Sequence, residues 1–541
     1  MTRAELVLTA VGLFAVSLVI RIATASLVVF PIPEDTAYYV SVSKHLVEGR
    51  GLVADAIWSF QTPPLVFPRP AFEVWLPLPS FLAALPMLIA GTTFRAAQVM
   101  PVIVGSLVPV LAWRIAADVA TELRLPIGRA RTLAVGTGLT CAVYLPLLLF
   151  STLPDSTMLF AALALGACPL MTRLARAQAP IGTGDPRLIA LGALIGLASW
   201  TRNEAVWIGL AWAVLAWTTI ATSAMDRLRL IAVPAVVAGL VFAPWAIRDW
   251  QVFGNPLPGQ ALTNALSITG FDIFAWQDPP TVSRYLAVGP ARLLEMRAEG
   301  LGHNLFSVLL VPGAPLSLVG LVALPLVVRL RSLRALILIS GVTFLVTSLA
   351  FPVATTWGTF LHAAGPVHVL FVIAALVGLD RLIAAVGRRR SWTNPVAWLA
   401  PALTVSGAVL FTAVLFPSFG GNSAAFQGRY VALDRQMAAA GLPLRSIGPV
   451  ITDFPIWLAE ATGAQSLALP SESPASVVDL AARFGARTLI INGTEHGGWP
   501  AVLDAGGPGS VCFTPVDIGT PADPADARAL ADTRVYRISC P

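Results

Sequence analysis

The sequence predicts a polytopic α-helical membrane protein with a small extracytoplasmic α/β domain at its C-terminal end. Of its 541 residues, 56% are hydrophobic and only 12% carry a charge. A helix needs roughly 20 mostly apolar residues to cross the hydrocarbon core, and about eleven runs approach or reach that length. A soluble chain of this length would instead form about three or four domains.

The apolar runs follow one another along the first three quarters of the chain. They lie near 6–30, 97–118, 131–150, 156–174, 187–201, 205–222, 230–247, 304–328, 335–351, 363–382 and 396–416. The segment 72–90 is also apolar, but three prolines interrupt it, so we expect it to lie against the outer leaflet. The first run could also be a signal peptide, because Ala23-Thr24-Ala25 resembles a cleavage site.

Basic residues predict the orientation of these helices. Clusters of arginine occupy every second loop, at 124–131, 173–187, 227–229, 329–334 and 388–390. Loops rich in Lys and Arg stay in the cytoplasm, so the N-terminus is expected inside and the C-terminus outside. The net charge of +6 is explained by this topology, and we infer no nucleic-acid partner.

The long segments on the external side define the domain organisation. We expect a transmembrane domain at 1–416, with external loops at 31–96 and 248–303, and a soluble α/β domain at 417–541. The segment 35–48 has the spacing of an interfacial helix. In the tail, Val450–Thr452 and Thr488–Ile491 are strand-like and 473–484 is helical, which predicts a short parallel sheet.

Cysteine usage differs between the two regions. Cys141 and Cys168 lie in apolar runs, where packing explains them. Cys512 and Cys540 both lie in the tail, in a compartment that permits disulfides. We predict a bridge between them; the alternative is two unpaired thiols.

Charged side chains gather where the helices meet the external side. Glu34 and Asp35 directly follow the first apolar run. Carboxylates are costly to place at a membrane boundary, so their presence there predicts a functional site. The alternative is a helix cap. Asp155 lies in the short external turn before the fourth run, where it could also be an N-cap.

The candidate binding residues could also have purely structural roles. Arg202 and Glu204, in the turn between the fifth and sixth runs, could simply form a charge pair. His362, before the tenth run, could cap a helix, and Arg69 could extend to lipid headgroups. Together these groups suit a charged, membrane-bound substrate.

These motifs, in this order, resemble the glycosyltransferase C superfamily, the lipid-phosphate-sugar-dependent enzymes that include protein O-mannosyltransferases and bacterial lipid A aminoarabinose transferases. The matching pieces are Glu34-Asp35-Thr36-Ala37-Tyr38-Tyr39, Glu48-Gly49-Arg50-Gly51, Arg69-Pro70, Leu153-Pro154-Asp155-Ser156, Thr201-Arg202-Asn203-Glu204 and Pro244-Trp245-Ala246-Ile247-Arg248. The family usually has Asp-Glu in the first motif, so the Glu-Asp order here leaves open which carboxylate is the base. The aminoarabinose transferases have Lys-Pro at Arg69-Pro70, which keeps the charge but changes its geometry.

The resemblance implies transfer of a sugar from a polyprenyl-phosphate donor to a glycan, lipid or protein acceptor. Such a leaving group needs a carboxylate to take the acceptor proton and cations to stabilise the departing phosphate. The catalytic candidates are Glu34, Asp35 and Asp155; the phosphate- and substrate-binding candidates are Arg69, Arg202, Glu204, His362 and Tyr38.

The sequence is also compatible with a bound metal ion and with other functions. No Cys/His metal spacing is present in the sequence, although carboxylates at this face could hold a divalent ion. A polymerase or ligase of lipid-linked glycans would use the same donor. A transporter or flippase is the alternative from another class, but intramembrane charges at mid-depth and inverted repeats, typical of such proteins, are not evident. An envelope structural protein would not need this charge constellation.

Overall fold

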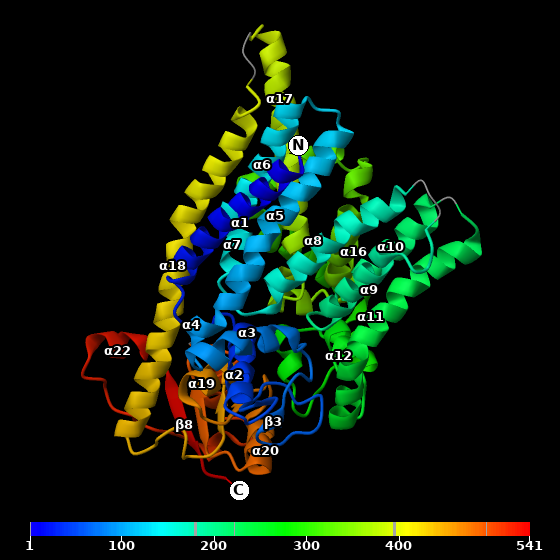
Figure 1. The fold of residues 1–541 in the computed structure, drawn as a ribbon. Helices are drawn as coiled ribbons and strands as arrows, with labels where there is room; N and C mark the ends of the chain where they lie inside the picture. Colours follow the sequence, from blue (N-terminus) through cyan, green and yellow to red (C-terminus); the bar gives the residue numbers. More distant parts are fainter. Residues whose placement is uncertain (1, 178–180, 221, 393–395, 494, 541) are drawn as a thin grey trace.

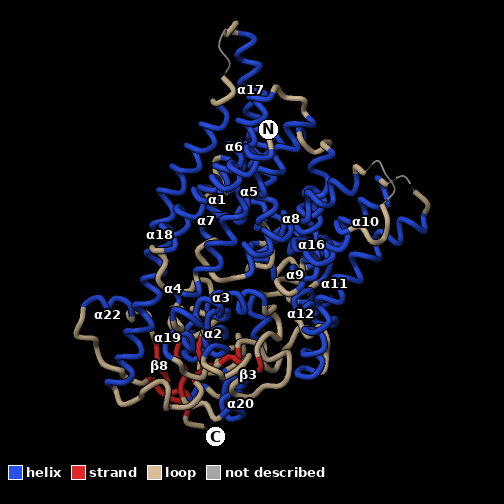
Figure 2. Tube along the Cα trace, in the orientation of Figure 1, coloured by secondary structure: helices blue, strands red, loops and turns tan. Residues whose placement is uncertain are grey.

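The computed structural model describes residues 2–177, 181–220, 222–392, 396–493 and 495–540. The chain forms a long helical region joined to a small domain that holds the strands (Figures 1 and 2). The ends of the chain lie toward opposite ends of the molecule. The predicted architecture, a polytopic helical membrane protein with a C-terminal α/β domain, is confirmed.

Each of the eleven predicted apolar runs contains at least one helix. Among the described residues, seven segments are long and apolar enough to span a membrane: α1 (Arg3–Ala25), α4–α5 (Phe94–Glu122), α8 (Ser156–Ala175), α11 (Ala224–Phe253), η4–α16 (Arg331–Ala350), α17 (Gly365–Arg389) and α18 (Leu399–Ala439). The other four runs form shorter pieces: α6 (Ile127–Val143) with α7 (Leu145–Phe150), α9 (Pro186–Ser199), α10 (Ala205–Thr219), and η2 (His303–Leu310) with α15 (Leu316–Ala323).

A proline explains the break between α6 and α7. Pro146 cannot donate a backbone hydrogen bond, and its ring would clash with the carbonyl of Ala142 in a continuous helix. That carbonyl instead accepts a hydrogen bond of 3.2 Å from Arg21 Nη1. Arg21 also donates to Ser17 and Ser151, so this fully buried guanidinium ties α1 to the ends of α6 and α7.

The arginine-rich loops lie toward the end of the helical region that carries the N-terminus, and three of them meet at Glu122. Glu122, at the end of α5, accepts hydrogen bonds from the backbone N–H groups of Arg331 (2.7 Å) and Ser332 (2.8 Å). Its carboxylate also pairs with Arg176 at 2.6 Å. This end lies opposite the strand-bearing domain (Figure 1).

The tail domain is built on a six-stranded sheet of order β2-β5-β4-β6-β8-β7. The strands are β2 (Ala56–Ile57), β4 (Val450–Thr452), β5 (Ser466–Ala468), β6 (Thr488–Ile491), β7 (Phe513–Pro515) and β8 (Arg534–Ile538). β2, β5, β4 and β6 are parallel, whereas β8 and β7 are antiparallel to their neighbours. The predicted strands are correct, but the sheet is mixed.

The first strand of this sheet does not come from the tail. β2 belongs to the 31–96 segment and pairs with β5, matching Ala56 with Ser466 and Ile57 with Leu467. The same segment forms α2 (Glu34–Val47), α3 (Leu78–Ala90) and the small β1 (Val53–Ala54)–β3 (Arg69–Pro70) ribbon. It therefore lies between the helical region and the tail domain and contacts both.

α18 connects the two regions without interruption. This helix of 41 residues continues from the apolar segment into the tail domain, so the division predicted at 416/417 falls within a helix. At the other end of the tail, Cys512 and Cys540 form a disulfide with a Cα–Cα distance of 5.1 Å. The remaining helices are α12 (Ala261–Leu266), η1 (Gly270–Phe274), α13 (Val282–Ala287), α14 (Gly289–Gly302), η3 (Leu324–Leu326), η5 (Ala354–Trp357), η6 (Leu361–Ala363), α19 (Pro455–Thr462), α20 (Pro474–Phe484), α21 (Ala501–Asp504), η7 (Ser510–Cys512) and α22 (Pro524–Ala529).

Candidate active site

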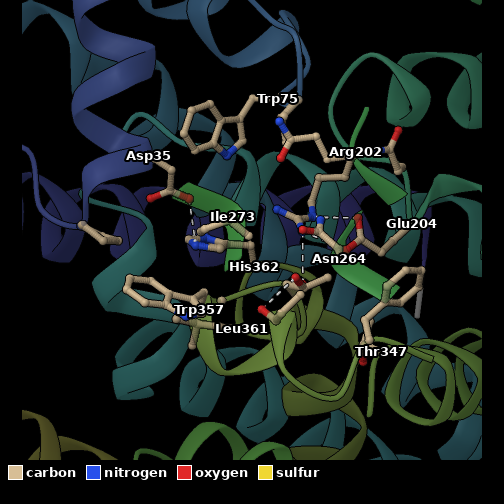
Figure 3. Close-up of a pocket in the computed structure, with 18 of the residues that line it drawn as sticks. Asp35, Trp75, Arg202, Glu204, Asn264, Ile273, Thr347, Trp357, Leu361 and His362 are labelled. Carbon is tan, nitrogen blue, oxygen red and sulfur yellow. Dashed lines mark hydrogen bonds and ion pairs between the residues drawn. The ribbon is translucent and has the colours of Figure 1, made fainter. Parts of the chain in front are cut away.

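A cavity of about 650 Å³ lies where the helical region, the 31–96 segment and the tail domain meet. Five of the predicted site residues line it: Glu34, Asp35, Arg202, Glu204 and His362. Figure 3 shows Asp35 and His362 on one side and Arg202 with Glu204 on the other. Segments far apart in the sequence thus bring acidic and basic groups to one cavity.

His362 lies between Asp35 and Asp155, and Asp35 and His362 line what we call the acidic side of the cavity. Its Nε2 lies 2.8 Å from Asp35 Oδ2, and its Nδ1 is 2.7 Å from Thr157 Oγ1 and 3.8 Å from Asp155 Oδ2. Burial disfavours the charged ring, but the two carboxylates outweigh burial and raise the pKa of His362. A Cβ on Gly358 would meet the ring at 3.1 Å, and the φ of +120° at Gly358 also requires glycine.

Glu34 and Asp35 are adjacent in sequence but face different surroundings. The carboxylate of Asp35 faces His362; burial opposes its ionisation, yet the charges of His362 and Arg202 lower its pKa below the usual value. Glu34 Oε1 accepts a hydrogen bond of 3.2 Å from the backbone N–H of Ile456, in α19 of the tail domain. Burial, reinforced by nearby Asp453 and Asp35, raises the pKa of Glu34 to about 8. Asp35 is therefore the ionised member of the pair at neutral pH.

Asp155 lies behind His362 and does not line the cavity. It is the N-cap of α8, with Oδ1 accepting a hydrogen bond of 2.8 Å from the backbone N–H of Thr157. Its other oxygen has no hydrogen-bond partner among the described residues and faces the His362 ring. Burial raises the pKa of Asp155 to about 6, although the charge of His362 acts in the opposite direction. Asp155 thus caps α8 with one carboxylate oxygen and faces His362 with the other.

Arg202 is held in a fixed orientation on the far side of the cavity. Its Nε and Nη2 donate to the two carboxylate oxygens of Glu204 at 3.1 and 2.8 Å. Nη1 donates to Ser156 Oγ at 2.9 Å and Nη2 also donates to the Thr359 carbonyl at 3.1 Å. Of the five guanidinium N–H groups, these partners leave one N–H on Nη1 for a ligand.

Arg69 and Tyr38, predicted to bind substrate, do not line the cavity. Arg69 is fully buried; it pairs with Glu73 at 3.1 Å and donates to the carbonyls of Ser59 (2.6 Å) and Thr62 (2.9 Å). Tyr38 accepts a hydrogen bond from the Phe72 backbone N–H at 2.6 Å and donates to Glu73 at 3.2 Å. Both residues therefore hold the 31–96 segment in shape through these contacts.

Sequence reasoning missed several residues that line the cavity. Tyr39 is the first: it lies four residues after Asp35, so both share one face of α2, and this spacing was a signal. The others lie in segments without a recognisable motif and include Trp58, Trp75, Gln260, Asn264 and Trp357. Figure 3 shows the Trp75 and Trp357 rings flanking the space beside Asp35 and His362.

The acidic side does not have the arrangement of a metal site. Among the residues that the structure describes, no group of three or more His, Cys, Asp or Glu side chains could hold a metal ion. Both ring nitrogens of His362 are engaged, Nε2 by Asp35 and Nδ1 by Thr157, so neither is free for a metal.

The helical region and the α/β tail define the fold of a membrane protein with several apolar helices, and the charged cavity lies between the two parts. No protein-family model matches the sequence, and no curated protein matches it. Solved structures do match: ArnT from Cupriavidus metallidurans bound to undecaprenyl phosphate has a TM-score of 0.54 at 12% identity, over 100% of both chains.

A second kind of solved structure has the same fold. The oligosaccharyltransferase of Archaeoglobus fulgidus tethered with an acceptor peptide has a TM-score of 0.52 at 14% identity, over 90% of this chain and 69% of that chain. A complex of the same enzyme with Zn and sulfate has a TM-score of 0.51 at 15% identity, over the same shares. The predicted resemblance to the glycosyltransferase C superfamily is confirmed as a likeness of fold.

Proposed function

We propose that this protein is a membrane glycosyltransferase that moves a sugar from a polyprenyl-phosphate donor to an acceptor hydroxyl. The observation that carries the proposal is one cavity with an ionised carboxylate, Asp35, on one side and a positioned guanidinium, Arg202, on the other. Its volume of about 650 Å³ is within the usual range of small-molecule sites, about 300–1,000 Å³.

Asp35 is the proposed general base. One lone pair of its carboxylate takes the proton of the acceptor hydroxyl while the hydroxyl oxygen bonds to the anomeric carbon. The bond from that carbon to the phosphate oxygen breaks in the same step, and its electron pair leaves with the phosphate. The His362 ring, 2.8 Å from Asp35 Oδ2, orients the carboxylate and keeps it ionised before the reaction.

Arg202 is the proposed partner of the departing phosphate. The free N–H on Nη1 donates to a phosphate oxygen, and the positive charge stabilises the negative charge that builds there. Glu204, Ser156 and the Thr359 carbonyl fix the guanidinium before the donor arrives. The pre-oriented group therefore needs no rearrangement during transfer, which is the condition for effective electrostatic stabilisation.

The walls of the cavity near Arg202 suit a lipid-linked substrate. Val206 and Trp207 of α10 and Val346 and Thr347 of α16 line this side. Both helices belong to the apolar region, so a polyprenyl chain can remain in the bilayer while its phosphate reaches Arg202. The undecaprenyl phosphate bound to ArnT, a protein of similar fold, supports this class of donor.

The same observations support an orientation and a cellular location. The arginine-rich loops lie at the end opposite the cavity, so the cavity and tail domain belong on the extracytoplasmic face of the plasma membrane. A hexose or a pentose on the donor suits the cavity. A flippase would instead need polar groups along a path through mid-membrane, whereas the paired carboxylates and arginine lie together at one end.

Mass spectrometry of the cell envelope tests the proposal. We expect a strain without the gene to lack one sugar residue on a defined class of glycolipid, glycan or glycoprotein. The wild-type gene should restore the sugar and the Asp35→Asn gene should not. An envelope that is unchanged by the deletion, or restored equally by both genes, would contradict the proposed function.

A further inference from the structure

The tail sheet turns its carboxyl edge toward the cavity. Trp58 directly follows the parallel strand β2, and Phe454 follows β4 by one residue more; both line the cavity. In open α/β sheets, ligands bind outside the carboxyl ends of parallel strands. The wall opposite the membrane helices is thus placed like the binding edge of such a sheet, although one strand comes from the 31–96 segment.

Two polar atoms on this wall have no partner. Trp58 Nε1 and Gln260 Oε1 are buried and make no hydrogen bond to any described residue; the exposed fractions of the two residues are 6% and 5%. Of the described residues with such atoms, these are the two that line the cavity. The Gln260 amide nitrogen donates to Ser59 Oγ, which holds the amide beside the residue next to Trp58.

These atoms form a complementary pair. The indole N–H is only a donor and the amide oxygen is only an acceptor, whereas a hydroxyl can do both. Ligand hydroxyl groups can therefore pair with either atom, donating to Gln260 Oε1 and accepting from Trp58 Nε1. The chemistry of this wall therefore favours a polyhydroxyl ligand over an apolar one.

Aromatic rings surround the pair. Trp58 lies against Trp75 with ring centroids 4.4 Å apart and an interplanar angle of 37°, and Trp75 lies against Tyr38 at the same distance. Phe274, Trp357 and Phe454 also line the cavity. Ring faces combined with a few hydrogen-bonding groups suit the apolar C–H faces and hydroxyls of a sugar ring.

The buried Arg69 supports this wall. It donates to the carbonyls of Ser59 and Thr62, so it fixes the segment that follows Trp58. Glu73 neutralises its charge at 3.1 Å and also receives the Tyr38 hydroxyl. The two predicted site residues that lie outside the cavity thus hold the Trp58 wall in position.

We propose that this wall is a saccharide subsite for the acceptor, built around Trp58 and Gln260. The proposal rests on the proposed function, since the donor's lipid and phosphate enter from the membrane side near Arg202. The acceptor must then approach Asp35 from the tail side, where Trp58 and Phe454 lie. The proposed acceptor is accordingly a sugar unit of a glycan or glycolipid rather than a peptide.

Ligand-observed NMR with the full-length protein in detergent tests the subsite. The probes are the methyl glycosides of glucose, galactose, mannose and arabinose, and a Ser/Thr-containing pentapeptide. We expect saturation transfer to at least one glycoside and none to the peptide. Trp58→Phe keeps the ring and removes the N–H, and Gln260→Met removes the amide; each should weaken glycoside binding about 3- to 10-fold, as loss of a neutral hydrogen bond predicts.

A matched control is available in Trp245. Its indole nitrogen is also buried and unpartnered among the described residues, but Trp245 does not line the cavity, so Trp245→Phe should leave glycoside binding unchanged. Binding of polyprenyl phosphate, followed as a thermal shift, shows that each variant is folded. If Trp58→Phe does not fold, Gln260→Met decides alone.

Three results would overturn the subsite: the wild type binds the peptide and no glycoside, both variants bind glycosides normally, or all three substitutions weaken binding equally. A competition separates the two sources of sugar. A glycoside that stays bound when polyprenyl-phosphate mannose is added occupies the acceptor position. A glycoside that polyprenyl-phosphate mannose displaces, but polyprenyl phosphate does not, occupies the position of the donor sugar. That second result would overturn the acceptor assignment. Failure of the wild type to bind polyprenyl phosphate would contradict the proposed function and leave the glycoside result to decide the subsite.

Discussion

His362 Nε2 lies 2.8 Å from Asp35 Oδ2 and joins the start of α2 to the segment that precedes α17. The contact unites two segments that are more than 300 residues apart in the sequence. It also couples their charges, because the carboxylate raises the pKa of the ring and the ring lowers the pKa of the carboxylate. The ionised state of the proposed base therefore depends on His362.

His362→Gln should reduce transfer and move the acid limb of the pH–rate profile to higher pH. Without the imidazolium, burial dominates and the pKa of Asp35 rises, so the base is protonated at a higher pH than in the wild type. The measurement is the initial transfer rate across acidic pH. His303→Gln is the control, because His303 also lines the cavity but pairs with no carboxylate among the described residues; an equal shift there would contradict the coupling.

Asp35→Asn should abolish transfer, with a loss of at least ~10²-fold if the carboxylate is the general base. The substitution keeps the size of the side chain, so we expect the protein to remain folded and to bind polyprenyl phosphate. Glu34→Gln should keep most of the activity, since Glu34 faces the Ile456 amide of the tail. Near-normal rates for Asp35→Asn would show that another group takes the proton.

The helical spacing and loop charges predicted much of this site. Alternating arginine clusters placed Asp35, Arg202 and His362 at one end of the helices, and the structure brings them to one cavity. The i,i+4 rule also separates Tyr39, on the face of Asp35, from Tyr38. Arg69 and Glu73 are also four residues apart, but Arg69 lies in β3, so helical spacing does not predict their 3.1 Å ion pair.

Other features could not be predicted because they depend on contacts between distant segments. β2 has only two residues, too few for an alternating pattern, and it becomes a strand only by pairing with β5. Gln260 lies in a long loop with no motif, and its position depends on Ser59. The apolar composition ends near 416, but α18 continues to Ala439, and composition alone does not predict this continuation.

Arg202→Ala should weaken binding of polyprenyl phosphate about 10- to 100-fold, the range expected for one hydrogen bond to a charged group. Only one N–H of Arg202 is left over by its described partners, so we expect a single strong bond rather than a bidentate grip. Titration of the thermal shift with polyprenyl phosphate measures the affinity. Arg248→Ala is the matched control, since Arg248 also pairs with a carboxylate, at 2.8 Å from Asp249, but lies outside the cavity.

Replacing Cys512 and Cys540 by alanine should destabilise the tail domain without changing the chemistry. The bridge closes a loop with a sequence separation of 28, for which the chain-entropy model gives about 3–4 kcal/mol. Limited proteolysis of the tail should become faster, while polyprenyl-phosphate binding should stay the same. Free alkylation of both thiols in unreduced wild-type protein would contradict the bridge.

Glu34→Gln should change how the stability of the contact between α2 and the tail depends on pH. The folded pKa of about 8 lies above the ordinary value for Glu, about 4.3. The stability that Glu34 contributes is therefore complete below about pH 4 and is lost as pH rises through about 8. Glutamine keeps an oxygen that can accept from the Ile456 amide but cannot ionise, so the variant should lose less stability on going from neutral pH to pH 9.

Thermal unfolding of the full-length protein between pH 5 and pH 9 measures this difference. We expect the wild type and Glu34→Gln to melt at similar temperatures near pH 5, and the variant to melt at the higher temperature at pH 9. The tail should respond most, because Glu34 contacts the first turn of α19. Glu5→Gln is the control, since Glu5 lies near the N-terminus and its side chain is about half exposed. If the melting temperatures of wild type and Glu34→Gln changed by the same amount between pH 5 and pH 9, the raised pKa of Glu34 would be contradicted.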